Sequence, residues 1–265
     1  MSRAMLDVRT VTATRYVTPL REGGSLPAIV EADDDGLYVL KFRGAGQGPK
    51  ALIAELVAGE LARAIGLPVP DIVFVELDAA LAGTEPDPEI QDLLKASVGL
   101  NLALDYLPGS IMYDPLVDRL GADLASRVVW FDAYVTNVDR TARNANMLMW
   151  HKKLWLIDHG AALYFQHSWT DYMERSRSPF ELIKEHVLLP SAAMIGEADS
   201  SLSSLVTPEV IHNVLALVPD EWLIAEPLFR SAGEAREAYA GYLLRRLEPP
   251  RLFAEEAERA RASLI

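Results

Sequence analysis

The sequence changes character near residue 105, and this change limits the folds open to the chain. Short runs rich in β-branched and aromatic residues, which favour strands, come first, at 26–32, 37–42, 72–77 and 98–106. One helix, at about 50–65, interrupts them, and Gly66 and two prolines end it. Later apolar residues mostly recur at helical spacing, at 124–135, 179–188, 208–217, 232–247 and 250–263. The pattern predicts an α+β chain with a strand-rich part over 1–105, built as an antiparallel sheet plus one helix, and a helical part over 106–265.

Composition narrows the possible functions. The chain has 265 residues, a net charge of −13 and no cysteine. The acidic balance argues against nucleic-acid binding, which needs clustered Lys and Arg, although Arg140, Arg143, Lys152 and Lys153 are expected to form a local basic patch. Without cysteine, disulfides and thiolate zinc sites are excluded. We find no signal peptide and no run of roughly 18 apolar residues that could span a membrane, so we expect a cytoplasmic protein.

Two acidic residues and an amide stand just past the junction between the two parts. Asp139 and Asn144 lie five positions apart, and Asp158 follows the apolar run 154–157. Kinases need a carboxylate to position the attacking hydroxyl, an amide oxygen for one magnesium ion and a second carboxylate for both ions. The spacing matches the pattern H-R-D-x-x-x-x-N followed by D-F-G, with Asn137 in place of the His and His159 in place of the Phe. The alternative is that these are ordinary loop residues, which turn chemistry favours there.

Lys41 is the second element of the predicted site. It lies in a strand between large apolar residues, where a kinase lysine would contact the α- and β-phosphates of ATP and pair with a glutamate from the next helix. That helix offers Glu55 and Glu60, which are about 140° apart around its axis, so only one can face Lys41. We choose Glu55, which shares a face with Leu52 and Gly59. A lysine at a sheet edge whose stem merely covers apolar surface is the simpler alternative.

Three further segments are candidates for nucleotide contact. Gly23, Gly24 and Ser25 precede the first clear strand, and their backbone N–H groups could approach phosphates. The glycines at 44, 46 and 48 could lie beside a substrate or nucleotide, although a plain loop is favoured. Backbone groups of Leu104, Asp105 and Tyr106, where the strand-rich part ends, could bind an adenine edge as a hinge between two lobes.

With these residues in place, the chain resembles the HipA-like kinases, a branch of the protein-kinase-like superfamily near the phosphoinositide 3/4-kinases. The matching segments are 39–42, 54–70, 105–109, 137–144 and 157–160. The resemblance implies a bilobal kinase fold with ATP and Mg²⁺ in the cleft between a strand-rich N-lobe and a helical C-lobe. It implies that Asp139 is the catalytic Asp, that Asn144 and Asp158 are metal ligands, and that Lys41 binds phosphate. We expect the chain to lack the usual extra N-terminal subdomain of the toxin-type members, and 166–265 carries no matching motif.

Several functions fit these residues. The first is phosphoryl transfer from ATP to Ser or Thr of an unknown protein, and a second is a small-molecule or lipid kinase. Aminoglycoside-type kinases usually carry a His two positions before the catalytic Asp, where this chain has Asn137. A nucleotide-binding pseudokinase or scaffold without turnover is the third. P-loop and G-x-S-x-G motifs are missing, and the histidines lack zinc-ligand spacing.

Overall fold

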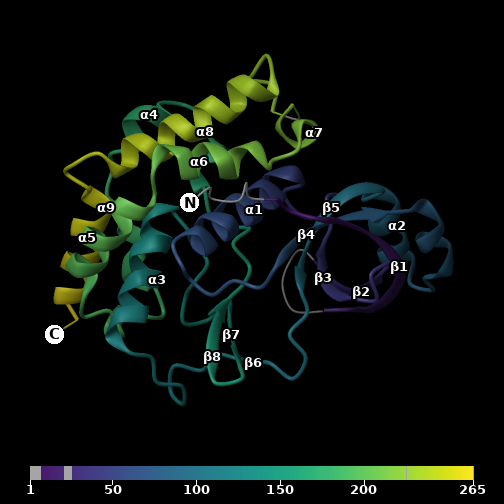
Figure 1. Ribbon diagram of the computed structural model, residues 1–265, viewed down its shortest axis with the longest axis horizontal. Helices are drawn as coiled ribbons and strands as arrows, with labels where there is room; N and C mark the ends of the chain where they lie inside the picture. The colour runs from purple at the N-terminus through teal and green to yellow at the C-terminus, as the bar shows by residue number, and fades with distance from the viewer. Residues whose placement is uncertain (1–6, 21–25, 225, 265) are drawn as a thin grey trace, which may run out of the picture.

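The N-terminal part of the chain forms a closed β-barrel (Figure 1). The computed structural model describes residues 7–20, 26–224 and 226–264. The barrel has the strand order β1-β2-β3-β5-β4, with strands β1 (Thr10–Pro19), β2 (Ala28–Ala32), β3 (Leu37–Lys41), β4 (Ile72–Leu77) and β5 (Gly99–Asp105). Neighbours run antiparallel except β1 and β4, whose parallel pairing closes the barrel. The predicted antiparallel sheet is therefore wrong in this respect.

Alternating side chains explain the barrel. Residues that point inward are mostly small or aliphatic, such as Ala28, Val30 and Leu40, with Tyr38 as an aromatic exception, while the residues between them are less buried. Strand β1 follows the same rule, since Val11 and Ala13 are buried and their neighbours are exposed. The sequence prediction missed β1 because its outward positions are polar and its buried residues are few.

Two helices accompany the barrel. Helix α1 (Pro49–Ala64) begins with a proline in its first turn, and every residue from Leu52 to Ala62 is buried. A helix buried on all sides belongs to a core rather than a surface. Helix α2 (Pro88–Ala96) follows the 3-10 turn η1 (Ala79–Thr84) beside the barrel. The prediction of a single helix in this part is therefore also wrong.

The rest of the chain is mainly helical. A three-stranded sheet, in the order β6-β7-β8, comprises β6 (Ile111–Met112), β7 (Met147–Trp150) and β8 (Lys153–Leu156). The helices are α3 (Ala122–Tyr134), α4 (Tyr172–Arg175), α5 (Ile195–Leu205), α6 (Pro208–Ala216), α7 (Asp220–Leu223), α8 (Ala232–Leu247) and α9 (Leu252–Ala262), with 3-10 turns η2 (Tyr164–His167), η3 (Glu181–Glu185) and η4 (Leu189–Ser191). The helix predicted at 179–188 is only the short turn η3, and α5 was not predicted.

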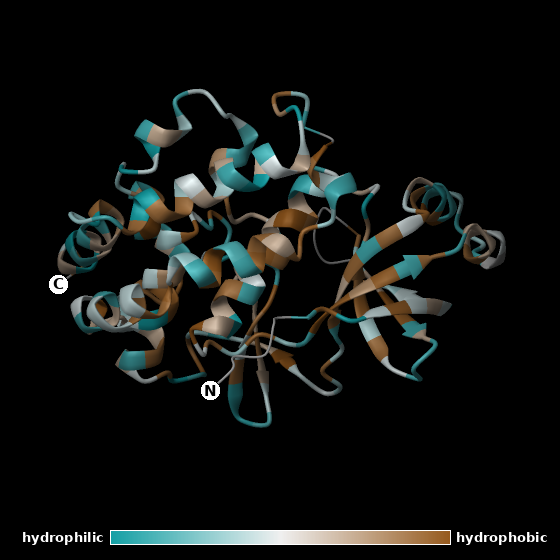
Figure 2. Cartoon of the chain, turned by 45° about the horizontal axis from the view of Figure 1, so that its top comes forward, coloured by the Kyte–Doolittle hydropathy of each residue, from teal (hydrophilic) through white to brown (hydrophobic). Residues whose placement is uncertain are grey.

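Two hydrophobic clusters hold these parts together. The smaller fills the barrel, and the larger joins α1 to the outer faces of β4 and β5 and to the C-terminal helices. Figure 2 shows hydrophobic residues both along the barrel strands and along the helices. Helix α1 therefore lies where the barrel meets the helical part (Figure 1). Within the described residues, no helix is long and apolar enough to cross a membrane.

Candidate active site

Lys41 lies between two carboxylates that come from different parts of the chain. Its neighbour Leu40 points into the barrel, so Lys41 faces outward from β3. The Lys41 Nζ is 2.5 Å from Glu55 Oε2 on α1 and 2.5 Å from Asp158 Oδ1. Glu60, the other candidate, pairs instead with Arg63 at 3.4 Å. The structure therefore brings Lys41, Glu55 and Asp158 together.

The charges of this cluster stabilise one another. Burial alone would lower the pKa of Lys41, but the nearby charges of Glu55 and Asp158 raise it above its usual value. Burial would likewise raise the pKa of Glu55, but Lys41 and His159 bring it below the usual range. Both groups are charged at neutral pH as a result. Asp158 is the most exposed of the three, with 43% of its side chain accessible.

Asp158 owes its position to a sharp turn after β8. Its φ of 55° is left-handed, which is uncommon for a residue other than glycine and is found often at functional sites. The preceding residue, Ile157, donates its N–H to Asn146 O at 3.0 Å. This bond attaches the segment that carries Asp158 to the loop that carries Asp139.

The Asp139 carboxylate is held by two amide side chains. Its Oδ2 accepts hydrogen bonds from Asn144 Nδ2 at 2.8 Å and from Asn146 Nδ2 at 3.2 Å. The Asp139 N–H donates to Asn137 Oδ1 at 3.2 Å. Because the Asn144 nitrogen is used in this way, its oxygen is left for another partner. Sequence reasoning missed Asn146, although the repeat of asparagine at 144 and 146 was a signal for it.

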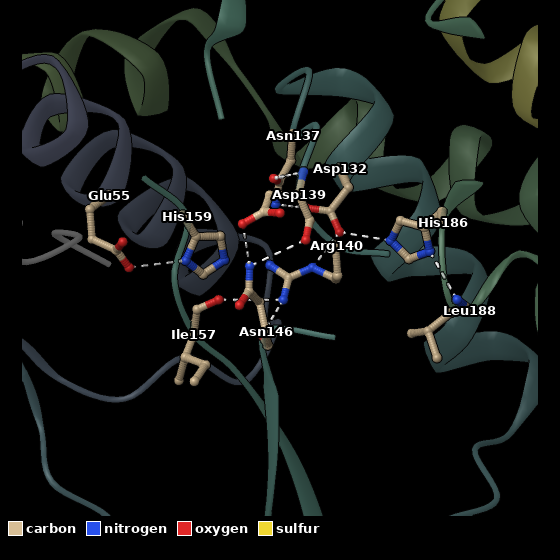
Figure 3. Close-up of polar contacts among 10 residues, drawn as sticks. All are labelled: Glu55, Asp132, Asn137, Asp139, Arg140, Asn146, Ile157, His159, His186 and Leu188. Atoms are coloured by element: carbon tan, nitrogen blue, oxygen red, sulfur yellow. Dashed lines mark hydrogen bonds and ion pairs between the residues drawn. The ribbon is translucent and has the colours of Figure 1, made fainter. Parts of the chain in front are cut away.

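A buried cluster beside this loop supports it (Figure 3). Asp132 of α3 accepts hydrogen bonds from Asn137 Nδ2 at 2.9 Å, Arg140 Nε at 2.6 Å and His186 Nε2 at 2.9 Å. Leu188 N–H donates to His186 Nδ1 at 3.0 Å, so the ring proton is on Nε2 and the histidine is neutral. Asp132 is the one charge in the apolar run 128–135, which was an overlooked sign of its role.

The pKa shifts in the cluster follow from burial and charge. Burial would raise the pKa of Asp132, but Arg140 and the hydrogen bond from His186 lower it below the usual range. Burial also lowers the pKa of His186, and its contact with Asp132 offsets this only in part. An ionised aspartate and a neutral histidine are therefore the stable forms.

Arg140 connects the two halves of the site. Besides binding Asp132, its Nη1 donates to the backbone oxygen of Asn146 and, at 3.4 Å, to that of Ile157. Only 1% of the residue is exposed. The expectation that Arg140 belongs to a surface basic patch is therefore wrong, because its charge is used inside the fold.

The predicted hinge is only partly free to bind a ligand. Leu104 is buried and pairs with β3 and β4 in the barrel sheet, and its side chain belongs to the larger hydrophobic cluster on the outer face. The Asp105 N–H donates to Asp71 O at 2.8 Å, and the Tyr106 N–H donates to Leu37 O at 2.9 Å. These two N–H groups serve the fold and are not available to an adenine ring. The prediction named backbone groups in general, so a hinge contact through a carbonyl oxygen of Asp105 or Tyr106 stays a prediction.

Of the two glycine segments predicted to lie near the nucleotide, the structure describes only the one that contains Gly44. Gly23, Gly24 and Ser25 lie outside the described residues. Gly44 lies against the C-terminus of α2, where an added Cβ would be 2.9 Å from the Ala96 carbonyl carbon. Gly44 is therefore needed for packing.

The residues present suit a hard cation with few protein ligands. Within the described part of the chain, no three His, Cys, Asp or Glu side chains gather as a metal site. Asp158 and the free oxygen of Asn144 offer a carboxylate and a neutral oxygen. Mg²⁺ is typically bound by one or two carboxylates while it keeps several waters, so this donor set fits Mg²⁺ better than zinc.

Solved structures resemble this chain at low sequence identity, and the first described here shares its fold. The crystal structure of a Helicobacter pylori proinflammatory kinase, CtkA, is 12% identical with a TM-score of 0.56, covering 97% of this chain and 99% of that one. The Golgi casein kinase is 12% identical with a TM-score of 0.47, covering 91% of this chain and 73% of its own. Its structure with Mn/ADP bound gives the same identity and score over 93% and 76%.

A search of curated proteins found no match. The sequence model of the HipA-like kinases, in contrast, matches residues 14–254, which is most of the chain and includes both halves of the site. The chain therefore belongs to the HipA-like kinase family.

Proposed function

We propose that this protein is an ATP- and Mg²⁺-dependent kinase that transfers the γ-phosphoryl group to a hydroxyl, with Ser or Thr of a protein as the favoured acceptor. Residues 1–105 and 106–265 act as the two lobes, with the nucleotide between them. The observation that carries the proposal is the position of Lys41, a partly buried cation between Glu55 and Asp158. Phosphoryl transfer depends on such a lysine, fixed by a helix glutamate and placed beside a metal-binding aspartate.

Lys41 and Glu55 bind and orient the phosphates. Glu55 is fully buried and is fixed by α1, so it can hold the Lys41 ammonium in one place. The lysine then presents its remaining donor capacity to phosphate oxygens, since an ammonium has three N–H donors. The Lys41–Glu55 pair is therefore in place before the nucleotide arrives.

Asn144 and Asp158 are the proposed holders of Mg²⁺. The Asn144 amide nitrogen is bound to Asp139, which turns the amide oxygen toward another partner. Asp158 is partly exposed and supplies the carboxylate. When bound, Mg²⁺ neutralises the charge that develops on the β- and γ-phosphates.

Asp139 is the proposed catalytic residue. Asn144 and Asn146 hold its Oδ2, so the carboxylate has a fixed direction before the acceptor arrives. Its role is to accept a hydrogen bond from the acceptor hydroxyl and take up its proton. Pre-set orientation of this kind is a large part of catalysis in phosphoryl transfer.

These roles can be tested with two variants, one expected to lose ATP binding and the other expected to lose only phosphoryl transfer. Asp158→Ala should weaken ATP binding in the presence of Mg²⁺, while Asp139→Ala should leave it close to that of the native protein, because Asp139 faces the acceptor. Titration calorimetry with ATP, with and without Mg²⁺, measures both. Equal binding by the native protein and Asp158→Ala, both dependent on Mg²⁺, would contradict the assignment of Asp158.

A further inference from the structure

His159 occupies the position of the Phe in D-F-G, but it makes a polar contact that a Phe cannot make. The residue is completely buried, and its Nδ1 lies 3.4 Å from Glu55 Oε1 (Figure 3). This distance is longer than an ordinary hydrogen bond. Neither ring nitrogen of His159, nor Glu55 Oε1, has a hydrogen-bond partner among the described residues. A buried polar atom without a hydrogen-bond partner destabilises the folded protein. A hydrogen bond between His159 Nδ1 and Glu55 Oε1 is therefore favourable.

The backbone fixes the ring at this place. His159 O accepts a hydrogen bond from Ala162 N at 2.8 Å, and the ring meets Phe131 edge to face. The next residue, Gly160, lies beside the Ala51 carbonyl of α1, where an added Cβ would be 3.6 Å from that oxygen. The segment 158–160 therefore lies against α1 close to Glu55.

Asp158 and His159 contact the Lys41–Glu55 pair from its two ends. Asp158 binds Lys41, Lys41 binds Oε2 of Glu55, and His159 faces Oε1 of the same carboxylate. Because Asp158 and His159 are adjacent in the chain, these contacts connect the four residues in a closed circuit. Because a carboxylate has two oxygens, Asp158 can hold a cation with Oδ1 kept on Lys41 or turned away from it, and in the second case Glu55 alone orients the lysine.

We propose that His159 is a positioning residue that donates its Nδ1 proton to Glu55 Oε1 and so keeps Glu55, and through it Lys41, in place when Asp158 turns to the metal. This inference rests on the proposed kinase function. Polar contacts of this kind are often long in a ligand-free site and shorten in the working complex. The histidine thereby links the metal-binding turn to helix α1 through one side chain.

Two substitutions separate the hydrogen bond from the packing. His159→Phe keeps most of the ring volume and the contact with Phe131 but removes the donor. His159→Asn loses the ring but places an amide N–H close to the position of Nδ1. We expect His159→Phe to lower the melting temperature by about 2–4 °C, because Glu55 loses a hydrogen-bond donor, and to lose about tenfold in kcat, with KM for ATP changed less than about twofold.

His159→Asn should show the opposite balance. Its melting temperature should fall further, because the ring leaves a cavity, but it should keep more of the native kcat than His159→Phe. A ring that only packs predicts the reverse order of activity, and that order would refute the proposal. The measurement is ADP release from Mg-ATP by folded protein.

A double-mutant cycle with Glu55→Gln tests the contact itself. After Glu55→Gln, His159→Phe should cause little further loss in kcat or in unfolding free energy, because the two side chains act as one unit. Additive losses would contradict the proposal. The control is His186→Phe, whose effect should add to that of Glu55→Gln, since His186 contacts Asp132 instead.

The two proposals fail in different ways. If the native protein releases no ADP, the kinase function fails, but the cycle in unfolding free energy still tests the His159–Glu55 bond. If the native protein turns over and His159→Phe is equally active, only the role of His159 fails.

Discussion

The ion pair between Asp132 and Arg140 is inaccessible to water, since both side chains are 0% exposed. Removing two charges from water is costly, and a buried pair is tolerated only when hydrogen bonds satisfy both partners. Here Asp132 accepts hydrogen bonds from three groups, and Arg140 also binds two backbone oxygens, while Arg140 Nη2 has no partner among the described residues. The pair therefore fixes the loop that carries Asp139.

Arg140→Met should reduce the free energy of unfolding by about 3–5 kcal/mol, because it leaves Asp132 buried without its counter-charge. The matched control is Arg15→Met, which breaks an exposed pair with Glu31 and should cost at most about 1 kcal/mol. Urea denaturation of the two variants measures the difference. Equal losses would show that burial of the Asp132–Arg140 pair does not matter.

His186 should make the fold sensitive to mild acid. Burial lowers its pKa in the folded protein, so below about pH 6.5 the unfolded chain takes up a proton that the folded one does not. Stability from this group is complete above that pH and falls as the pH drops toward the folded pKa, by at most about 1.4 kcal/mol per pH unit.

Melting temperatures between about pH 6.5 and 5 test this prediction, because most carboxylates are still ionised there. His186→Gln should reduce the dependence on pH. His167→Gln is the control: burial and then Lys50 also lower the pKa of His167, but the residue is exposed and solvent weakens its effect. A native slope retained in His186→Gln would contradict the assignment.

At the scale of elements, the C-terminus of α2 lies directly against the loop after β3. Gly44 N–H donates to Ser97 Oγ at 3.0 Å, and Arg43 N–H donates to Asn101 Oδ1 at 2.8 Å. These bonds connect the strand that carries Lys41 to α2 and β5. The loop is thus held in place without any ligand.

Gly44→Ala should destabilise the protein by about 1–3 kcal/mol, since a new methyl group would meet backbone atoms of Ala96 that cannot move aside. Gly83→Ala is the control, because nothing lies within 4 Å of the position of its Cβ, and it should change stability little. The melting temperatures of both variants test this prediction. An equal change in the two variants would show that the close contact of Gly44 with Ala96 does not matter for stability.

Much of the local structure could be predicted from sequence, because the spacing of apolar residues and the Gly and Pro residues that end helices and strands are local signals. Helix α1 begins at Pro49 and β4 spans 72–77, close to the predicted bounds. The parallel pairing of β1 with β4 joins residues about 60 positions apart, and no local pattern reveals such a contact. The helix α5 was missed because its serine-rich sequence resembles a loop.

Only the site residues that follow a known spacing along the sequence could be predicted. Motif spacing selected Asp139, Asn144 and Asp158 as candidates, and the structure brings the first two into direct contact. The contact of Asp132 with His186, 54 residues later, depends on how η3 and η4 fold back onto α3. Spacing alone therefore gives the residues of the site but not their support.

For the whole molecule, α1 is the element shared by the barrel and the helical part. Its side chains lie in the large hydrophobic cluster, and its Glu55 contacts Lys41 on the barrel. Two ion pairs add to this junction: Arg43 with Glu221 at 3.5 Å, and Lys50 with Glu226 at 2.6 Å. The barrel side therefore contacts the helical part both at the site and at the segment around α7.

The most direct test of the kinase proposal is incubation of the purified protein with Mg-ATP, with ADP release and intact mass measured beside Asp139→Ala. The account predicts that the native protein forms ADP, with water as acceptor if no other is supplied, and gains phosphoryl mass if a serine or threonine of its own is within reach. Asp139→Ala should do neither. A native protein that binds Mg-ATP but forms no ADP, or an Asp139→Ala variant with native turnover, would contradict it.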